Sequence, residues 1–202
     1  MLLSMNVIEL FSSIDGEGKR QGFLTTFLRL HDCNIRCSYC DTLYSYGPES
    51  TFESMSVQAV ADVIEQLENH RITVTGGEPL LQEPAIIELI DELTRRNARY
   101  DFNIETNGTI IPSFHRDNVW FTYDYKTPSS LAEDAMNLDI FKVATPADII
   151  KFVVGSMQDL DRVWGNIEGA TIVDYMKAHD WQNVRFQLQI HKFIWDPDAK
   201  GV

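Results

Sequence analysis

Three cysteines, the only ones in the chain, lie close together as Cys33, Cys37 and Cys40 in the pattern C-x3-C-x2-C. Thiolates bind iron–sulfur clusters, and spacings of two or three residues let one loop surround a single cluster. Three thiolates can hold three irons of a [4Fe–4S] cluster and leave the fourth iron open to an exogenous ligand, which suits catalysis. The number of cysteines is odd and they lie close together, and both features argue against a disulfide framework.

A structural zinc site is the alternative for the same cysteines. His31 lies two residues before Cys33 and would complete a Cys3His ligand set. Thiolates serve both metals, so the cysteine spacing alone leaves both possibilities open. With zinc, the chain would be an interaction module without catalysis.

A glycine-rich segment, Thr75-Gly76-Gly77-Glu78-Pro79, follows a short β-branched run. Glycines directly after a strand expose backbone groups at close range, and a glutamate there can accept a hydrogen bond from an ammonium group. Alone, the segment is more typical of a turn that ends a strand. Together with the cysteine pattern, it indicates a cofactor site.

The segments around these motifs alternate between strand and helix patterns. Strands are predicted at residues 6–10, 25–30, 72–75, 102–105, 119–123, 149–154 and 184–190. Helices are predicted at residues 56–69, 85–97 and 159–178. Such alternation implies parallel βαβ units, but a full eight-fold barrel takes about 250 residues. We therefore predict an α/β fold, a partial TIM-type barrel of about six mostly parallel strands, in a single domain spanning 1–202.

The charge and hydropathy of the chain exclude some partners. A formal net charge of −13 argues against a large nucleic-acid surface, because phosphate binding needs clustered Lys and Arg. No apolar run reaches the roughly 20 residues of a membrane-spanning helix, and the first residues lack the basic start of a signal peptide. We expect no nucleic-acid or membrane partner and a cytoplasmic location.

The cysteine and glycine motifs, with the aromatic Tyr39 before the last cysteine, resemble those of the radical S-adenosylmethionine (radical SAM) superfamily. The resemblance extends over nearly the whole chain to one member family, the 7-carboxy-7-deazaguanine synthases. It is carried by FSSIDGEG at 11–18, FLRL at 27–30, CDT at 40–42, ETNGT at 105–109, DYKTPSS at 124–130 and QIHK at 189–192. It implies a radical SAM core, a [4Fe–4S] cluster, S-adenosyl-L-methionine and Mg²⁺.

The reaction implied by this resemblance starts when the reduced cluster cleaves S-adenosyl-L-methionine to a 5′-deoxyadenosyl radical. The radical takes a hydrogen from 6-carboxy-5,6,7,8-tetrahydropterin, the ring contracts, ammonia leaves and 7-carboxy-7-deazaguanine forms. The family also implies a homodimer and an electron donor such as flavodoxin or ferredoxin. A glycyl-radical activase would share the cysteine loop but would leave residues 124–130 and His191 without a role.

The resemblance also implies roles for individual residues. The cluster ligands would be Cys33, Cys37 and Cys40, and the Mg²⁺ ligand would be Thr42. Cofactor contacts would come from Tyr39, Asp41, Gly77, Glu78, Glu105, Asp124, Tyr125 and Lys126. Substrate contacts would come from Ile14, Asp15, Gly16, Glu17, Arg29, Thr75 and His191. Beyond cluster and cofactor no catalytic residue is implied, apart from His191 as a candidate proton relay.

Several of these residues also have ordinary interpretations. Arg29 can bind a carboxylate through two parallel hydrogen bonds from its planar guanidinium, and a surface ion pair is the ordinary alternative. Thr42 offers the hard oxygen that Mg²⁺ prefers, yet such a hydroxyl commonly caps a loop.

The sequence also departs from the family pattern in two places. Asp15 stands where members of the family usually carry glutamine, and the chain is short between residues 154 and 184.

Overall fold

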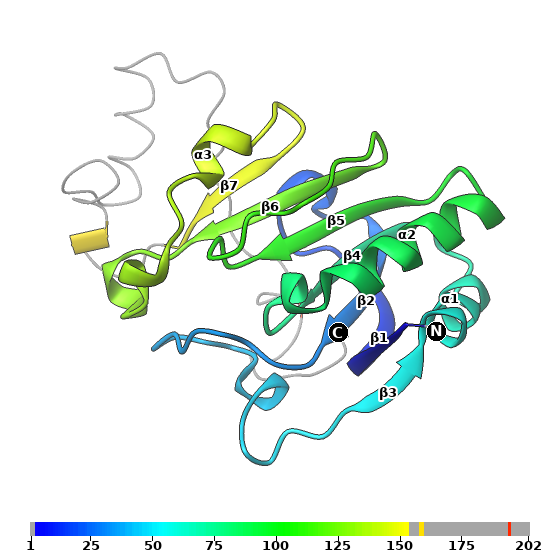
Figure 1. Ribbon diagram of the computed structural model, residues 1–202, viewed down its shortest axis with the longest axis horizontal. Helices are drawn as coiled ribbons and strands as arrows, with labels where there is room; N and C mark the ends of the chain where they lie inside the picture. Colours follow the sequence, from blue (N-terminus) through cyan, green and yellow to red (C-terminus); the bar gives the residue numbers. More distant parts are fainter. Residues whose placement is uncertain (1–2, 154–157, 160–193, 195–202) are drawn as a thin grey trace.

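A computed structural model describes residues 3–153, 158–159 and 194 of the chain (Figure 1). The strands are β1 (Ser4–Ile14), β2 (Leu24–Leu30), β3 (Glu53–Ser56), β4 (Arg71–Gly76), β5 (Asp101–Thr106), β6 (Val119–Tyr125) and β7 (Ile149–Phe152). The α-helices are α1 (Val57–Gln66), α2 (Glu83–Arg96) and the short α3 (Ile140–Val143). The predicted strand at 184–190, His191 and nearly all of the predicted helix at 159–178 lie outside the described residues.

The strands form one seven-stranded sheet in the order β3-β1-β2-β4-β5-β6-β7. Strand β1 pairs antiparallel with both of its neighbours, whereas every pair from β2 to β7 is parallel. All strands except β1 therefore run in one direction, and the described sheet is not closed. This confirms the predicted partial α/β barrel. Strand β3 was not predicted, because its sequence ESMS is short and polar, as is usual for an edge strand.

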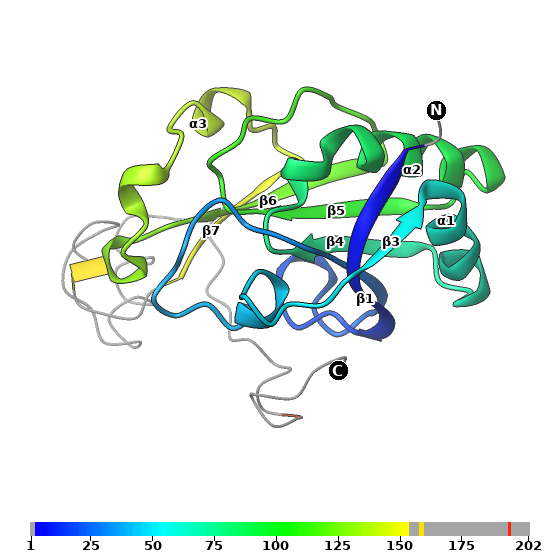
Figure 2. The same cartoon turned by 60° about the horizontal axis from the view of Figure 1, so that its bottom comes forward.

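One face of the sheet packs against the helices and forms the hydrophobic core (Figure 2). The strand residues on this face are almost completely buried and alternate along each strand: Leu28, Leu30, Ile72, Val74, Phe102, Ile104, Phe121 and Tyr123. The helices contribute Val60, Ile64, Ile86, Leu89, Ile90 and Leu93. Helix α1 begins where the Ser56 hydroxyl accepts a hydrogen bond from Ala59 N, as an N-cap does.

The opposite face of the sheet is polar, because successive side chains of a strand point to opposite sides. Its side chains include Arg29, Thr73, Thr75, Asn103, Glu105, Thr122, Asp124 and Lys151. The register aligns Arg29 with Thr75, Glu105 with Thr122 and Asp124 with Lys151 across neighbouring strands. We call this set the polar face. In the described part of the chain, no helix is long and apolar enough to cross a membrane.

Candidate active site

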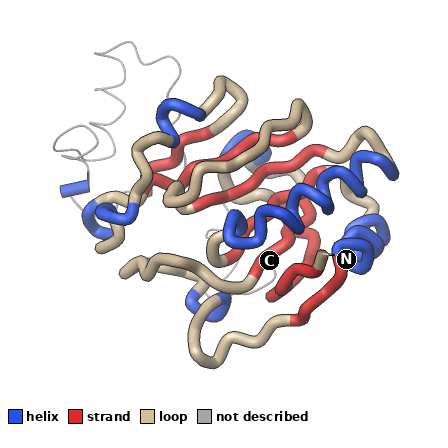
Figure 3. The backbone as a smooth tube through the Cα atoms, viewed as in Figure 1, coloured by secondary structure: helices blue, strands red, loops and turns tan. Residues whose placement is uncertain are grey.

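The motifs found in the sequence meet at one edge of the sheet, where the parallel strands end. The cysteine loop, residues 31–40, leaves β2, and Gly76 ends β4. Asn107 follows β5, and Lys126 follows β6. Figure 3 shows these connections as loops that extend from the strand ends. The carboxyl ends of parallel strands are where α/β folds place their ligands, so this edge is the candidate active site.

The glycine pair lies directly against the start of the cysteine loop. Gly77 N donates to Leu30 O at 3.1 Å, and Glu78 N donates to Asp32 O at 2.7 Å. A Cβ atom on Gly77 would lie 1.7 Å from Asp32 O, and one on Gly76 would lie 2.3 Å from Leu30 O. Gly76 also has a φ of +128°, which favours glycine. The glycines are therefore required by the close approach of two backbone segments.

Glu78 is completely buried and holds the neighbouring loop in place. Its carboxylate accepts hydrogen bonds from Leu80 N at 2.9 Å, Thr106 Oγ1 at 2.9 Å and Asn107 N at 2.7 Å. Burial raises the pKa of Glu78, and these donors oppose the increase. The structure thus gives Glu78 a positioning role, and its contact with a cofactor ammonium stays a prediction.

Asn107 connects the loop after β5 to the first cysteine. Its Oδ1 accepts from Thr109 N at 3.0 Å and Thr109 Oγ1 at 2.7 Å. These two donors fix the amide so that Nδ2 faces Cys33 Sγ at 3.7 Å and Asn34 Oδ1 at 2.9 Å. Asn107 was not predicted as a site residue, although it lies within the ETNGT segment.

The three cysteines present a set of free thiols that can hold an iron–sulfur cluster. All are unpaired and half-buried, and burial raises the pKa of Cys33 and Cys37, the latter opposed by Lys126. A [4Fe–4S] cluster distributes its thiolates over separate irons, so three half-buried thiols in one loop are a suitable set of ligands.

His31, the fourth ligand in the zinc alternative, contacts an aromatic ring. The His31 ring packs on the Phe52 ring, with 4.2 Å between the centroids. Thr42, by contrast, lies at the cysteines, because its Oγ1 is 3.6 Å from Cys40 Sγ and donates to Gly76 O at 3.4 Å. The residues present therefore fit a cluster loop with a hydroxyl beside it.

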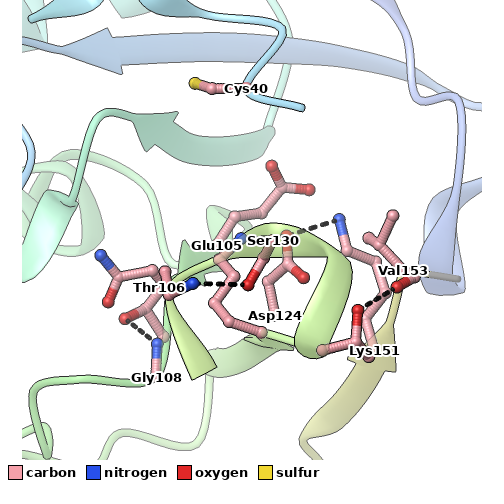
Figure 4. A network of polar contacts seen from close by, with 12 residues as sticks. Cys40, Glu105, Thr106, Gly108, Asp124, Ser130, Lys151 and Val153 are labelled. Carbon is pink, nitrogen blue, oxygen red and sulfur yellow. Dashed lines mark hydrogen bonds and ion pairs between the residues drawn. The ribbon is translucent and has the colours of Figure 1, made fainter. Parts of the chain in front are cut away.

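A group of charged side chains lies on the polar face near the cysteine loop (Figure 4). Lys151 Nζ is 2.8 Å from Glu17 Oε1 and 3.5 Å from Asp124 Oδ2, and Lys126 Nζ is 3.0 Å from the same Asp124 oxygen. Glu105 lies beside this group, and burial raises its pKa to about 7, opposed by Lys151 and aided by Glu17. Four of these residues were predicted from the sequence as ligand contacts, whereas Lys151 was missed.

Arg29 forms an ion pair on the polar face. Its Nε donates to Glu9 Oε1 at 2.7 Å, and the Tyr44 hydroxyl donates to the same oxygen at 2.6 Å. The register places Arg29 opposite Thr75, whose hydroxyl donates to Glu105 Oε2 at 2.8 Å. The ordinary interpretation of Arg29 as part of an ion pair is thus observed, and its binding of a substrate carboxylate stays a prediction.

The segment after β1 brings its predicted substrate residues to the polar face. Asp15 is buried, and Thr73 Oγ1 and Glu17 N each donate to its carboxylate at 3.4 Å. Burial raises the pKa of Asp15, and these donors oppose the increase. Gly16 is buried beside it and Ile14 is the last residue of β1. Four predicted substrate positions, 14–17, therefore lie at one end of the polar face.

The remaining predicted cofactor residues differ in their surroundings. Tyr39 is half-buried, which raises its pKa, whereas Asp41 is exposed. Tyr125 packs against Phe141 and Phe152, with ring centroids 6.0 and 5.1 Å away. The segment after β6 also holds the cysteine loop, because Ser38 N donates a hydrogen bond to Ser130 O at 2.9 Å.

Comparison with known proteins agrees with this geometry. The sequence model of the Radical SAM superfamily matches residues 29–153, which include the cysteine loop and the strands that surround it. The chain therefore belongs to the radical SAM superfamily. The 7-carboxy-7-deazaguanine synthase of Clostridium acetobutylicum is 36% identical across 99% of this chain and 100% of its own length. That of Leptospira interrogans is 34% identical across 99% of each chain. Within the superfamily, the chain belongs to the 7-carboxy-7-deazaguanine synthase family.

A solved structure shares the fold. The crystal structure of QueE from Escherichia coli aligns with a TM-score of 0.70 and 22% sequence identity, and the alignment covers 88% of this chain and 92% of that chain.

Proposed function

We propose that this chain converts 6-carboxy-5,6,7,8-tetrahydropterin to 7-carboxy-7-deazaguanine with loss of ammonia, in queuosine-type biosynthesis. The observation that carries the proposal is the full-length similarity to synthases of that name, with the cysteine loop held against the glycine motif. Further relatives that align over nearly their whole length have the same name, which favours this reaction over glycyl-radical activation.

In this proposal Cys33, Cys37 and Cys40 hold the [4Fe–4S] cluster, and cluster and S-adenosyl-L-methionine together supply homolytic hydrogen abstraction. The residues of the chain bind and orient the cofactor and the substrate. Cofactor contacts are assigned to Tyr39, Asp41, Gly77, Glu78, Glu105, Asp124, Tyr125 and Lys126. Support comes from the buried Oδ1 of Asp124, which has no hydrogen-bond partner within the described residues and can accept from a hydroxyl of the cofactor.

The substrate is assigned to the polar face beside the cysteine loop. The carboxylate of the pterin would replace Glu9 as the ion-pair partner of the Arg29 guanidinium. Asp15 and Glu17 would accept from N–H groups of the pterin, with Ile14, Gly16 and Thr75 alongside. His191, the candidate proton relay, lies outside the described residues. We further propose that the chain acts as a single domain, as a cytoplasmic homodimer, reduced by a flavodoxin or ferredoxin.

The proposed reaction is tested by anaerobic reconstitution followed by a turnover assay. The wild-type chain should bind about four irons and convert the carboxy-tetrahydropterin to a product with the mass of 7-carboxy-7-deazaguanine. Cys33→Ala, Cys37→Ala and Cys40→Ala should each prevent iron binding and turnover, because three thiolates are needed. Stoichiometric zinc without iron, or an iron-loaded wild type that leaves the pterin unchanged, would contradict the proposal.

Thr42 is proposed to bind Mg²⁺, which would offset the charge of the substrate carboxylate. Mg²⁺ accepts few protein oxygens together with substrate and water oxygens, so one threonine hydroxyl suffices. Thr42→Val keeps the shape but removes the ligand. We expect this variant to bind iron and S-adenosyl-L-methionine normally, to lose at least about tenfold in turnover, and to lose its response to added Mg²⁺. Steady-state turnover with and without Mg²⁺ measures both effects.

Thr51→Val is the matched control, because Thr51 is an exposed threonine in the same connection between β2 and β3. It should behave as wild type. If the wild type ignores Mg²⁺ and Thr42→Val turns over normally, Thr42 does not bind a catalytically relevant metal.

A further inference from the structure

Lys151 lies where two parts of the site meet. It comes from β7, and its ammonium contacts the carboxylates of Glu17, in the segment after β1, and of Asp124, on β6. The side chains of all three residues are only 20% to 23% exposed. The two carboxylates belong to segments more than a hundred residues apart in sequence, so Lys151 is a direct link between them.

The charge balance explains why a cation is needed at this position. Glu17, Asp124 and Glu105 surround Lys151 from three different elements, and Lys126 is the other cation that contacts Asp124. Burial alone would lower the pKa of Lys151, but the three carboxylates outweigh it and hold the pKa well above its usual value. Lys151 is therefore charged, and without it Asp124 would keep Lys126 as a cation partner, whereas Glu17 and Glu105 would lose the Lys151 ammonium beside them.

The two carboxylates are held in fixed positions while they bind Lys151. Asp124 uses Oδ2 for both lysines, and its buried Oδ1 has no hydrogen-bond partner in the described part of the chain. Glu17 contacts Lys151 through Oε1, next to the buried Asp15. Because a carboxylate oxygen has more than one lone pair, a fixed and ionised carboxylate is a preorganised acceptor for a ligand O–H or N–H group.

We propose that Lys151 is a positioning residue that holds Glu17 for the pterin and Asp124 for S-adenosyl-L-methionine, and thereby couples the two binding sites. The inference rests on the proposed function, which assigns these two carboxylates to the two ligands. Lys151 itself touches neither ligand in this proposal and acts through its two partners.

The test uses the reconstituted holoenzyme as wild type, Lys151→Met, Lys151→Arg and Lys142→Met. Lys142 is a matched control, because its side chain is exposed and pairs with Asp139 on the surface. Lys151→Met should bind iron normally yet raise both the pterin KM and the S-adenosyl-L-methionine Kd at least about tenfold, since both carboxylates lose their anchor. Lys151→Arg and Lys142→Met should stay within about threefold of wild type for both ligands.

The pH profile separates this role from a merely structural one. The Lys151 ammonium lowers the pKa of Glu105, so its removal raises the pKa of that carboxyl further. The acid limb of kcat/KM for the pterin should therefore move to higher pH by at least about one unit in Lys151→Met. Lys151→Arg, which keeps the charge, should leave the limb in place.

Glu17→Gln and Asp124→Asn provide a second route if Lys151→Met does not fold. Each keeps its size and removes one charge that holds Lys151. Each should weaken its own ligand and, through the shared lysine, the other ligand by at least about threefold. If each affects its own ligand alone, or if Lys151→Met binds both ligands as wild type does, the coupling is wrong. A wild type that does not convert the pterin overturns the proposed function and this inference with it.

Discussion

Replacing Gly77 with alanine is expected to abolish cluster binding, although Gly77 has no side chain to offer the metal. The new Cβ atom would lie 1.7 Å from Asp32 O, a backbone atom that can move only with the segment just before Cys33. The hydrogen bonds from Gly77 N to Leu30 O and from Glu78 N to Asp32 O would break in the same displacement. Iron content after anaerobic reconstitution should fall from about four per chain to less than one.

Gly22→Ala is the matched control for this prediction. Gly22 has a φ of +83°, so alanine is strained there, but no heavy atom beyond its chain neighbours lies within 4 Å of the added Cβ. That strain costs about 1 kcal/mol and should leave iron binding intact. Circular dichroism of both variants checks that they are folded. A Gly77→Ala protein that is loaded with iron like the wild type would show that the cysteine loop does not depend on this contact.

Removing the carboxylate of Glu78 should produce the second large effect, a loss of folding stability. Glu78→Ala leaves Leu80 N, Thr106 Oγ1 and Asn107 N without their acceptor in a completely buried position. Each unsatisfied buried group costs about 1–3 kcal/mol, so we expect the loss of three acceptor contacts to lower the free energy of unfolding by about 3–9 kcal/mol. Urea unfolding of the metal-free chain measures this without any contribution from iron.

Two further variants test the reason for this loss. Glu78→Gln keeps one oxygen acceptor and should lose less stability than Glu78→Ala. Glu83 also accepts two hydrogen bonds, from Ser113 N and Oγ, but in an exposed setting, so Glu83→Ala should cost less than about 1 kcal/mol. If Glu78→Ala is as stable as Glu83→Ala, the buried hydrogen bonds of Glu78 do not hold the loop after β5.

The sequence predicts the architecture of the site well, because the architecture depends on local patterns. Strand and helix periodicity implies parallel βαβ units, and parallel strands bring their carboxyl ends to one edge. The cysteine loop, the glycine pair and the loop after β5 therefore had to meet, and they do. The short edge strand β3 was missed, because four residues with a single apolar side chain, Met55, carry no periodic signal.

The contacts within the site could not be predicted, because they depend on the register between distant strands. Lys151 lies in an apolar run, IIKFVV, and its sequence does not reveal that β6 places Asp124 beside it. The direction of the Glu78 side chain is decided by Leu80 N in the turn after β4 together with Thr106 Oγ1 and Asn107 N at the end of β5. The pairing of Arg29 with Glu9 follows from the antiparallel register of β1 and β2, which the alternation of helices and strands did not indicate.

The contact between residues 30–32 and 76–78 makes the start of the cysteine loop and the glycine-rich segment dependent on each other's sequence. A side chain at position 77 is acceptable only if the path of the chain at Asp32 changes with it, so the two segments are expected to vary as a pair. On the other side of this anchor, Asn34 is held by Asn107 and Ile35 is buried, so the path between the first two cysteines is fixed as well. An insertion just before Cys33 would therefore shift every ligand of the cluster.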